Sequence, residues 1–451
     1  MLLPTACSAP AATAPRADAA VDGPVDGSAA ADVATDDGIP ADAGPVGDAG
    51  PAELHRRIVR TTLAFDLTAH TGHARIDLAA ADAPGVTFEV GELAIGAVRD
   101  GSGTTLTTSQ DGALLHVDAP AAAATVDVTY GYRQHDPADF QGVNAAYTLT
   151  WPYYCGNVFP CHSDPAGGTT FALSLTGVPT GQTAVCPTMI PADAPAYQLA
   201  WAVGTYETVD LGATPGGTHL VVHAFPADVA AARTATAHLV DGFAWYERTL
   251  GSYAFGSEAG SVEAAWGPGA YGGMEHHPLW HVGASAIGDE LTHLHEAAHG
   301  WFGDGIRVAC WEDFVLSEGT VNYLAARATG VVSGAAAETA VWTRYDRSAG
   351  AFGLVAWPSG CHTVDVLRDH LFSQAPYVRG AHFHRALEHR LGTDAYDAIL
   401  RRFYAEHRTQ AARLTDLLGL VRTVSGYDPT DCAVSWLRPT RTADRGPDPC
   451  E

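Results

Sequence analysis

The sequence contains no lysine. All 25 basic residues among its 451 are arginines, and 51 aspartates and glutamates oppose them, so the formal net charge at pH 7 is -26. A surface of this sign repels phosphate backbones, which excludes nucleic acid as the expected partner. The chain also lacks an apolar run of the roughly 18–20 residues that span a bilayer, so no transmembrane segment is predicted.

No CxxC pair occurs among the eight cysteines, which disfavours a structural zinc ribbon. If Cys7 is set aside, seven cysteines remain, and this odd number predicts one free thiol. The spacing of the others suits disulfides in an oxidising compartment, and buried free thiols are the alternative. The candidate pairs are Cys155 with Cys161, Cys310 with Cys361, and Cys432 with Cys450.

Residues 1–54 have almost no large apolar side chains and carry nine acidic residues against Arg16. Such a segment cannot bury enough surface to offset its ordering entropy, so we expect a disordered spacer. The start "MLLPTACSAP" resembles the end of a bacterial lipoprotein signal without its charged region and most of its apolar region. We therefore expect an exported bacterial protein, at the cell surface, in the periplasm or outside the cell, with Cys7 as a candidate lipid anchor. An accidental resemblance is the other interpretation.

In the rest of the chain the spacing of apolar residues changes once, from alternating to helical. Residues 55–210 contain short alternating segments such as "RTTLAFDLT" and "TTFALSLTGV", which predict an antiparallel β domain. Helical periodicity dominates residues 211–451, including one helix predicted over "ADVAAARTATAHLVDGFAWYERTLG" that stops at Gly251. The predicted fold class is therefore α+β with several domains, the β domain preceding a mainly helical domain.

The stretch "HLHEAAHGWFGD", residues 293–304, contains the pattern HExxH at His295, Glu296 and His299. On a helix, positions i and i+4 share one face, so both imidazoles can bind one ion. Glu296 then projects beside the metal and can take a proton from its bound water.

A catalytic zinc needs a third protein ligand and an open position for water. A histidine six residues after His299 is excluded, because position 305 is a glycine. Glu318 lies 18 residues beyond His299 in the helical stretch "WEDFVLSEGTVNYLAAR", where a returning helix would face the first one. Glu312 is the rival ligand, and we expect it to be solvated.

Other residues of these segments have less specific interpretations. We expect His293, on the other side of the first helix, to support the site or to lie at the surface. We expect Trp301 and Phe302 to pack in the core behind the metal helix. Ser285 misses the GxSxG pattern of serine hydrolases by one residue. The histidines expected to line the site without binding metal are His276, His277 and His281.

HEAAHGWFGD, followed by Trp311, Leu316 and the Glu318–Gly319 pair, resembles the M1 family of zinc aminopeptidases. Upstream, "GGMEH" at 272–276 resembles the family's GxMEN signature, and "PYVRG" at 376–380 resembles its Pro-Tyr-x-Lys/Arg-Gly segment. The resemblance covers about residues 57–440. It implies a saddle- or sandwich-like N-terminal β domain and a thermolysin-like catalytic domain.

The resemblance also implies roles for individual residues. One zinc ion would be held by His295, His299 and Glu318, with Glu296 as general base. Tyr377 would stabilise the oxyanion, and Glu275 would anchor the α-ammonium of a peptide with a free N-terminus. The remaining residues that the resemblance places at the substrate are Gly272, Gly273, Met274 and Arg379.

Two departures from the family pattern affect specificity. The glutamine that often lines the first specificity pocket is not evident, and Trp151 or Tyr153 stands near its place. We also expect no C-terminal helical-repeat domain, which would leave the cleft more open. The alternatives to an aminopeptidase are therefore a zinc endopeptidase or other zinc hydrolase, and a non-catalytic surface binding protein on the same fold. The oligomeric state and the preferred amino acid stay undetermined.

Overall fold

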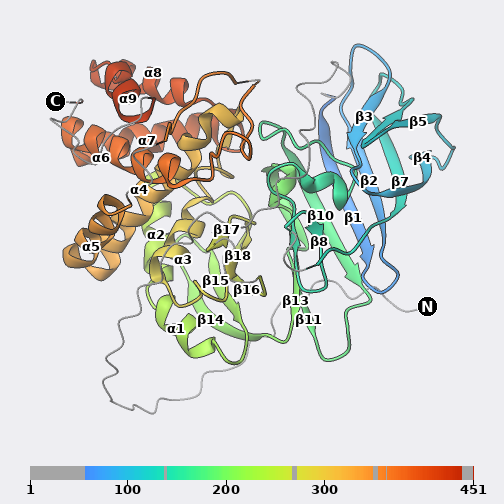
Figure 1. Ribbon diagram of the computed structural model, residues 1–451, viewed down its shortest axis with the longest axis horizontal. Coiled ribbons are helices and arrows are strands. Elements are labelled where there is room, and N and C mark those ends of the chain that lie inside the picture. Colours follow the sequence, from blue (N-terminus) through green and yellow to red (C-terminus); the bar gives the residue numbers. More distant parts are fainter. Residues whose placement is uncertain are drawn as a thin grey trace.

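A computed structural model describes residues 56–136, 140–266, 272–348, 354–361, 363–438 and 450. The predicted spacer 1–54 and the candidate anchor Cys7 lie outside these residues. Figure 1 shows a β-rich region on the right, a mixed sheet in the middle and a group of helices on the left. The predicted order of a β domain followed by a mainly helical domain is thus confirmed.

The first domain is built on a six-stranded sheet of order β12-β10-β1-β2-β7-β4 (Figure 1). Every second residue of β2 and β10 is buried, because successive side chains of a strand point to opposite faces and one face covers the core. The strands are β1 (Ile58–Asp66), β2 (Thr71–Leu78), β4 (Ala94–Asp100), β7 (Ala124–Gly131), β10 (Thr169–Thr176) and β12 (Met189–Ala194).

Smaller elements complete this domain. A three-stranded sheet has the order β3-β6-β5, and two short ladders pair β8 with β9 and β11 with β13. These strands are β3 (Val86–Glu89), β5 (Thr108–Asp111), β6 (Leu114–Val117), β8 (Gly142–Val143), β9 (Thr148–Leu149), β11 (Thr183–Val185) and β13 (Ala202–Gly204).

One strand pair departs from the predicted antiparallel arrangement. β1 and β10 run parallel, with Arg60 opposite Thr170 and Asp66 opposite Thr176. A parallel pair needs a long connection that returns the chain to the end of the sheet where β1 begins, whereas a hairpin joins only antiparallel strands. The chain between β1 and β10 is long enough for that return.

The second domain begins with a five-stranded sheet of order β14-β15-β16-β18-β17. Its strands are β14 (Glu207–Ala213), β15 (His219–Ala224), β16 (Glu258–Ala264), β17 (Gly273–Met274) and β18 (Leu279–Gly283). β15, β16 and β18 run parallel, whereas β14 and β17 pair antiparallel at the two edges. The predicted domain boundary at residue 210 falls inside β14.

Nine helices are seen in the described part of this domain, and α4 lies among them with most of its residues buried. They are α1 (Val229–Ala235), α2 (Leu239–Leu250), α3 (Glu290–Ala298), α4 (Phe314–Ser333), α5 (Ala335–Asp346), α6 (Gly380–Leu391), α7 (Thr393–His407), α8 (Leu414–Ser425) and α9 (Thr430–Leu437). A π-helical turn, Ala375–Arg379, leads into α6, and β19 (Arg307–Val308) pairs with β20 (Ala411–Ala412). None of the described helices combines the length and apolar character that a membrane span requires.

The single helix predicted before Gly251 is two helices, α1 and α2. Thr234 and Thr236 hydroxyls donate to the carbonyls of Ala230 and Ala232, a back-bonding that competes with helix continuation. The predicted stop is confirmed, because Gly251 caps α2 with a φ of 131° that suits glycine.

The structure contains the disulfides Cys155–Cys161, Cys310–Cys361 and Cys432–Cys450. Cys186 is disulfide-bonded as well, and no free thiol is found among the described cysteines. The expectation of one free thiol is therefore wrong for this part of the chain.

Candidate metal centre

Helix α3 carries both histidines of the HExxH pattern. Its first turn is capped by Asp289, whose side chain accepts a hydrogen bond from the Leu291 amide, and His299 follows its last residue in helical conformation. The Nε2 atoms of His295 and His299 lie 3.2 Å apart. The one-turn spacing therefore aims both imidazoles at one point.

Helix α4 brings Glu318 to the same point. Its Oε2 atom lies 3.3 Å from His295 Nε2 and 3.5 Å from His299 Nε2. Three tetrahedral ligands at about 2.0–2.1 Å from a zinc ion stand roughly 3.3–3.4 Å from each other. The triangle formed by these three atoms therefore has the size that a zinc site requires.

The proton positions also fit a cation. His299 Nδ1 lies 3.0 Å from the carbonyl oxygen of Phe302, which only accepts, so Nδ1 carries a proton and Nε2 is the nitrogen that can bind a metal ion. His295 Nδ1 likewise faces Asn322 Oδ1 at 2.8 Å. Glu318 Oε2 has no hydrogen-bond donor in the described structure. Three possible ligand atoms thus converge, an arrangement that a metal ion stabilises.

The electrostatic potential at this point is negative. Burial by itself would lower the pKa of His299, but the carboxylates of Glu318 and Glu275 outweigh it and raise this pKa to about 10. Burial would raise the pKa of Glu318, but His299 and His295 outweigh that effect and lower it, so Glu318 stays ionised. A cation at the centre is favoured by both shifts.

Glu296 lies beside the ligands and is almost completely buried, and its Oε2 has no hydrogen-bond partner in the described structure. Burial raises the pKa of this carboxyl well above its ordinary value. Strand β17 passes directly against it: a Cβ added to Gly273 would lie 2.3 Å from Glu296 Oε1. The space where a side chain at Gly273 would lie is therefore taken by the Glu296 side chain.

His277 holds the helix that bears Glu296. Its Nε2 donates to the Glu296 carbonyl at 2.7 Å, and its Nδ1 accepts from the Tyr253 hydroxyl at 2.7 Å. Burial lowers the pKa of His277 to about 3, which keeps the ring neutral for these two bonds. His277 therefore supports the site from behind instead of lining it.

Glu275 follows β17 and is 5% exposed. One of its oxygens lies within 4.8 Å of ligand atoms of both His299 and Glu318. Burial raises its pKa to about 7, with His299 opposing the shift and Glu318 adding to it. A second buried carboxylate thus stands next to the metal ligands at a fixed distance.

Tyr377 lies in the π-helical turn before α6. Its ring stacks on the His295 ring at 6.2 Å between centroids and meets Phe314 edge-on at 5.9 Å. A glycine contact permits this approach, because a Cβ on Gly319 would lie 2.6 Å from the Gly380 Cα. The Glu318–Gly319 and Arg379–Gly380 pairs therefore bring α4 and Tyr377 together.

Two residues expected at the substrate are used differently. Arg379 is fully buried, and its guanidinium donates to the carbonyl oxygens of Trp436 and Leu354, so the expected substrate contact is wrong. Met274 is buried in an apolar cluster that also contains Trp151 and Trp311. Gly272 is exposed, as an open backbone position would be.

The expected solvation of Glu312 and the surface alternative for His293 are both wrong. Glu312 is buried, where Arg413 and Arg438 pair with it and the Gly360 amide donates to it. His293 is buried away from the surface, accepting from the Ser261 hydroxyl and donating to the Ile287 carbonyl. By contrast, Trp301 and Phe302 pack in the core as expected.

Sequence reasoning missed three residues of this region. Asp304 is fully buried with neither carboxylate oxygen hydrogen-bonded in the described structure, and Tyr197 lies close to it and to Glu275. Asn322 was detectable, because it follows Glu318 by four positions and so shares its helix face. The burial of Asp304 and Tyr197 had no local signal.

Aromatic residues form one wall near the centre. Trp151 meets Trp311 edge-on at 6.0 Å and lies 5.9 Å from Phe314. The Tyr153 hydroxyl accepts a hydrogen bond from the Val366 amide at 2.7 Å, which ties the β domain to the segment before Tyr377. Trp151 and Tyr153, which stand near the place of the glutamine expected in the first specificity pocket, thus both belong to this aromatic wall.

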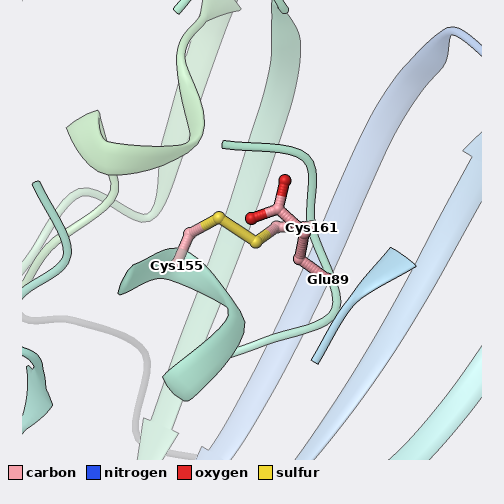
Figure 2. Close-up of side chains that lie close together, drawn as sticks. All are labelled: Glu89, Cys155 and Cys161. Atoms are coloured by element: carbon pink, nitrogen blue, oxygen red, sulfur yellow. A yellow bond between two sulfur atoms is a disulfide. The ribbon is translucent and has the colours of Figure 1, made fainter. Parts of the chain in front are cut away.

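A second group of metal-type side chains has another explanation. Figure 2 shows the Glu89 carboxylate beside Cys155 and Cys161, close enough for a shared ion. The two sulfur atoms are bonded to each other, so they are not thiolate ligands. Glu89 accepts hydrogen bonds from the Ser163 amide and hydroxyl instead.

Comparison with known proteins agrees with this geometry. Residues 290–436 match the model of the peptidase family M1 domain. The chain is 26% identical to leucine aminopeptidase 2-1 of Meyerozyma guilliermondii over 284 residues, and 26% identical to aminopeptidase B of Mus musculus over 295 residues. These matches cover 56% and 58% of this chain and 43% of each relative, so the chain spans less than half of their length.

Solved structures share the fold. An M1 zinc metallopeptidase from Deinococcus radiodurans superposes with a TM-score of 0.72 at 19% identity, covering 87% of this chain and 96% of that one. Yeast LTA4 hydrolase in complex with bestatin has a TM-score of 0.69 at 18% identity, covering 85% of this chain and 68% of that one. At this identity the likeness concerns the fold alone.

Proposed function

Because the chain carries a catalytic domain of peptidase family M1, we propose that it is a zinc aminopeptidase that releases N-terminal residues from peptides. One observation carries the proposal: His295, His299 and Glu318 bring three ligand atoms within 3.2–3.5 Å of each other, with Glu275 buried beside them. One zinc ion held there would lower the pKa of a bound water and polarise the scissile carbonyl.

Glu296 is the general base in this proposal. Its buried carboxyl has an oxygen free of other hydrogen bonds in the described structure, so it can take a proton from the attacking water. The same carboxyl can then carry that proton to the leaving amine. The His277 bond to the Glu296 carbonyl and the Gly273 backbone restrict where this side chain can go.

Glu275 makes the enzyme an exopeptidase in this proposal. A carboxylate at a fixed place beside the metal ligands can pair with the α-ammonium of the substrate, which sets one residue between that charge and the cleaved bond. An internal peptide bond has no ammonium to pair with Glu275. The burial of this carboxylate therefore favours an aminopeptidase over the endopeptidase alternative.

Tyr377 is proposed to donate its hydroxyl hydrogen to the oxyanion that develops during attack. Its ring stacks on His295, which places this side chain beside the metal ligands. A donor aimed at developing charge stabilises the transition state more than the bound substrate.

The decisive experiment compares zinc content and turnover of a free aminoacyl amide with turnover of its N-acetylated form. We expect about one zinc per chain and turnover of the free amine only. Glu275→Gln should lower kcat/KM for the free amine and leave the acetylated form unaffected. Equal wild-type turnover of both would favour the endopeptidase, and bound zinc without any turnover would favour a binding protein.

We further propose that the protein is exported, on the support of the three disulfides, which persist in oxidising compartments. Cell fractionation tests this step. A wholly cytosolic protein would contradict this proposal.

A further inference from the structure

The two histidine ligands differ in what holds their other ring nitrogen. His299 Nδ1 donates to a backbone carbonyl, that of Phe302, at 3.0 Å, with the Ser317 hydroxyl further away at 3.4 Å. His295 Nδ1 faces a side chain instead, Asn322 Oδ1, at 2.8 Å. Only the His295 contact can thus be changed by substitution without altering the backbone.

The orientation of the Asn322 amide and the tautomer of His295 are coupled. If the amide presents Oδ1, the imidazole proton sits on Nδ1 and Nε2 has a lone pair for the metal. If it presented the NH2 group, Nδ1 would accept and the proton would sit on Nε2, pointing at Glu318 and His299. Only the first arrangement leaves the three ligand atoms free to bind an ion.

Helix α4 carries both Asn322 and the third ligand, Glu318. Glu318 and Asn322 are four residues apart, so both project from one face toward α3. The Tyr345 hydroxyl of α5 donates to the Asn322 carbonyl at 3.2 Å, and Asn322 is 8% exposed. The amide therefore reaches His295 from a backbone that is held in place.

We propose that Asn322 is a positioning residue that fixes the ring and the proton of His295 and thereby sets the zinc affinity of the site. The proposal rests on the proposed function in one respect, that the site binds zinc. Removing an outer hydrogen-bond partner of a metal-binding histidine costs about 10–100-fold in metal affinity in other proteins.

The choice of an amide over a carboxylate has a chemical consequence. Glu275, Glu296, Glu318 and Asp304 already bring four carboxyl groups into one buried region. A carboxylate at position 322 would add a fifth and would make the His295 ring more electron-rich. A zinc ion bound to such a ring withdraws less charge from its water, so the pKa of that water would rise.

The test measures the zinc dissociation constant by chelator competition for Asn322→Leu and Asn322→Asp. The leucine variant keeps the branched shape, with a larger volume, and loses the acceptor, and we expect zinc binding about 10–100-fold weaker. The aspartate variant restores an acceptor, so we expect zinc binding at least as tight as in the wild type. Its acidic limb of kcat/KM against pH should move to higher pH.

Ser317→Ala is the matched control, because Phe302 still accepts the His299 proton, and its zinc affinity should stay within twofold of the wild type. Zinc binding by Asn322→Leu within threefold of the wild type would overturn the proposal. So would an equal loss in the leucine and aspartate variants, because aspartate restores the acceptor for the His295 proton. A wild-type protein that binds zinc without turnover would overturn only the proposed function, and one that binds no zinc would overturn both.

Discussion

Gly273 offers a test of how tightly the general base is packed. In Gly273→Ala the new methyl carbon would lie 2.3 Å from Glu296 Oε1 and 2.5 Å from its Cδ. An ordinary contact needs about 3.5 Å, so the carboxyl must retreat by about 1 Å. Gly273 does not have a positive φ, so the strain is steric and not a matter of backbone conformation.

A displacement of about 1 Å in a catalytic group costs on the order of 100-fold in rate, or about 2.7 kcal/mol of transition-state stabilisation. We therefore expect kcat of Gly273→Ala to fall by roughly two orders of magnitude. Zinc content should be unchanged, because the nearest atoms to the added carbon all belong to Glu296. Steady-state kinetics on a free aminoacyl amide and metal analysis of the same preparation measure both quantities.

Gly272→Ala is the control in the neighbouring position, where the nearest atom to an added carbon is the Ala286 Cβ at 3.9 Å. It should keep the wild-type kcat. In a Glu296→Ala background, Gly273→Ala should not lower the residual rate further, because the carboxyl that the added methyl group would contact is absent. Near-normal kcat in Gly273→Ala would refute the steric argument, and a rise in KM that persists without the Glu296 carboxyl would return Gly273 to a substrate contact.

Three other predictions concern single groups. Glu318→Gln should lose bound zinc while Glu296→Gln keeps zinc and loses turnover, and zinc unaffected by the first change would overturn the ligand set. Tyr377→Phe should keep zinc and lose about 3 kcal/mol of transition-state stabilisation, measured as kcat/KM, and an unchanged rate would remove the phenol from the reaction. Burial lowers the pKa of His384 to about 3, so the unfolded chain, with its ordinary pKa near 6.5, binds the proton first and stability falls as pH drops from about 6.5 toward 3. Urea unfolding of His384→Gln should therefore show a pH dependence shallower by about 1.4 kcal/mol per pH unit in this range, and identical slopes would contradict the buried neutral ring.

The metal ligands were predictable because their signal is local. The spacing of His295 and His299 is set by one helical turn, and Glu318 needs only a loop and a returning helix. The change from alternating to helical periodicity placed the β domain before the helical one. Such features depend on residues that are close together in the sequence, so they can be predicted without knowing the fold.

Solvation was not predictable in the same way. Glu312 and His293 are polar residues whose burial depends on partners far along the chain, Arg413 and Arg438 for the first and Ser261 for the second. A buried charge or imidazole is stable only where such partners meet it. The residues next to Glu312 and His293 in the sequence do not indicate those partners.

Helix α4 shows why the site and the fold cannot be separated. Glu318 supplies a ligand, Asn322 one turn later accepts the proton of another ligand, and Gly319 lets the turn before α6 approach. Any rotation of α4 about its axis would move all three at once, since they lie within five consecutive residues. The metal ligands therefore depend on the docking of α3 and α4, and Tyr377 joins them through the contact of Gly319 with Gly380, so a side chain added at Gly319 should disturb Tyr377 and Glu318 in the same step.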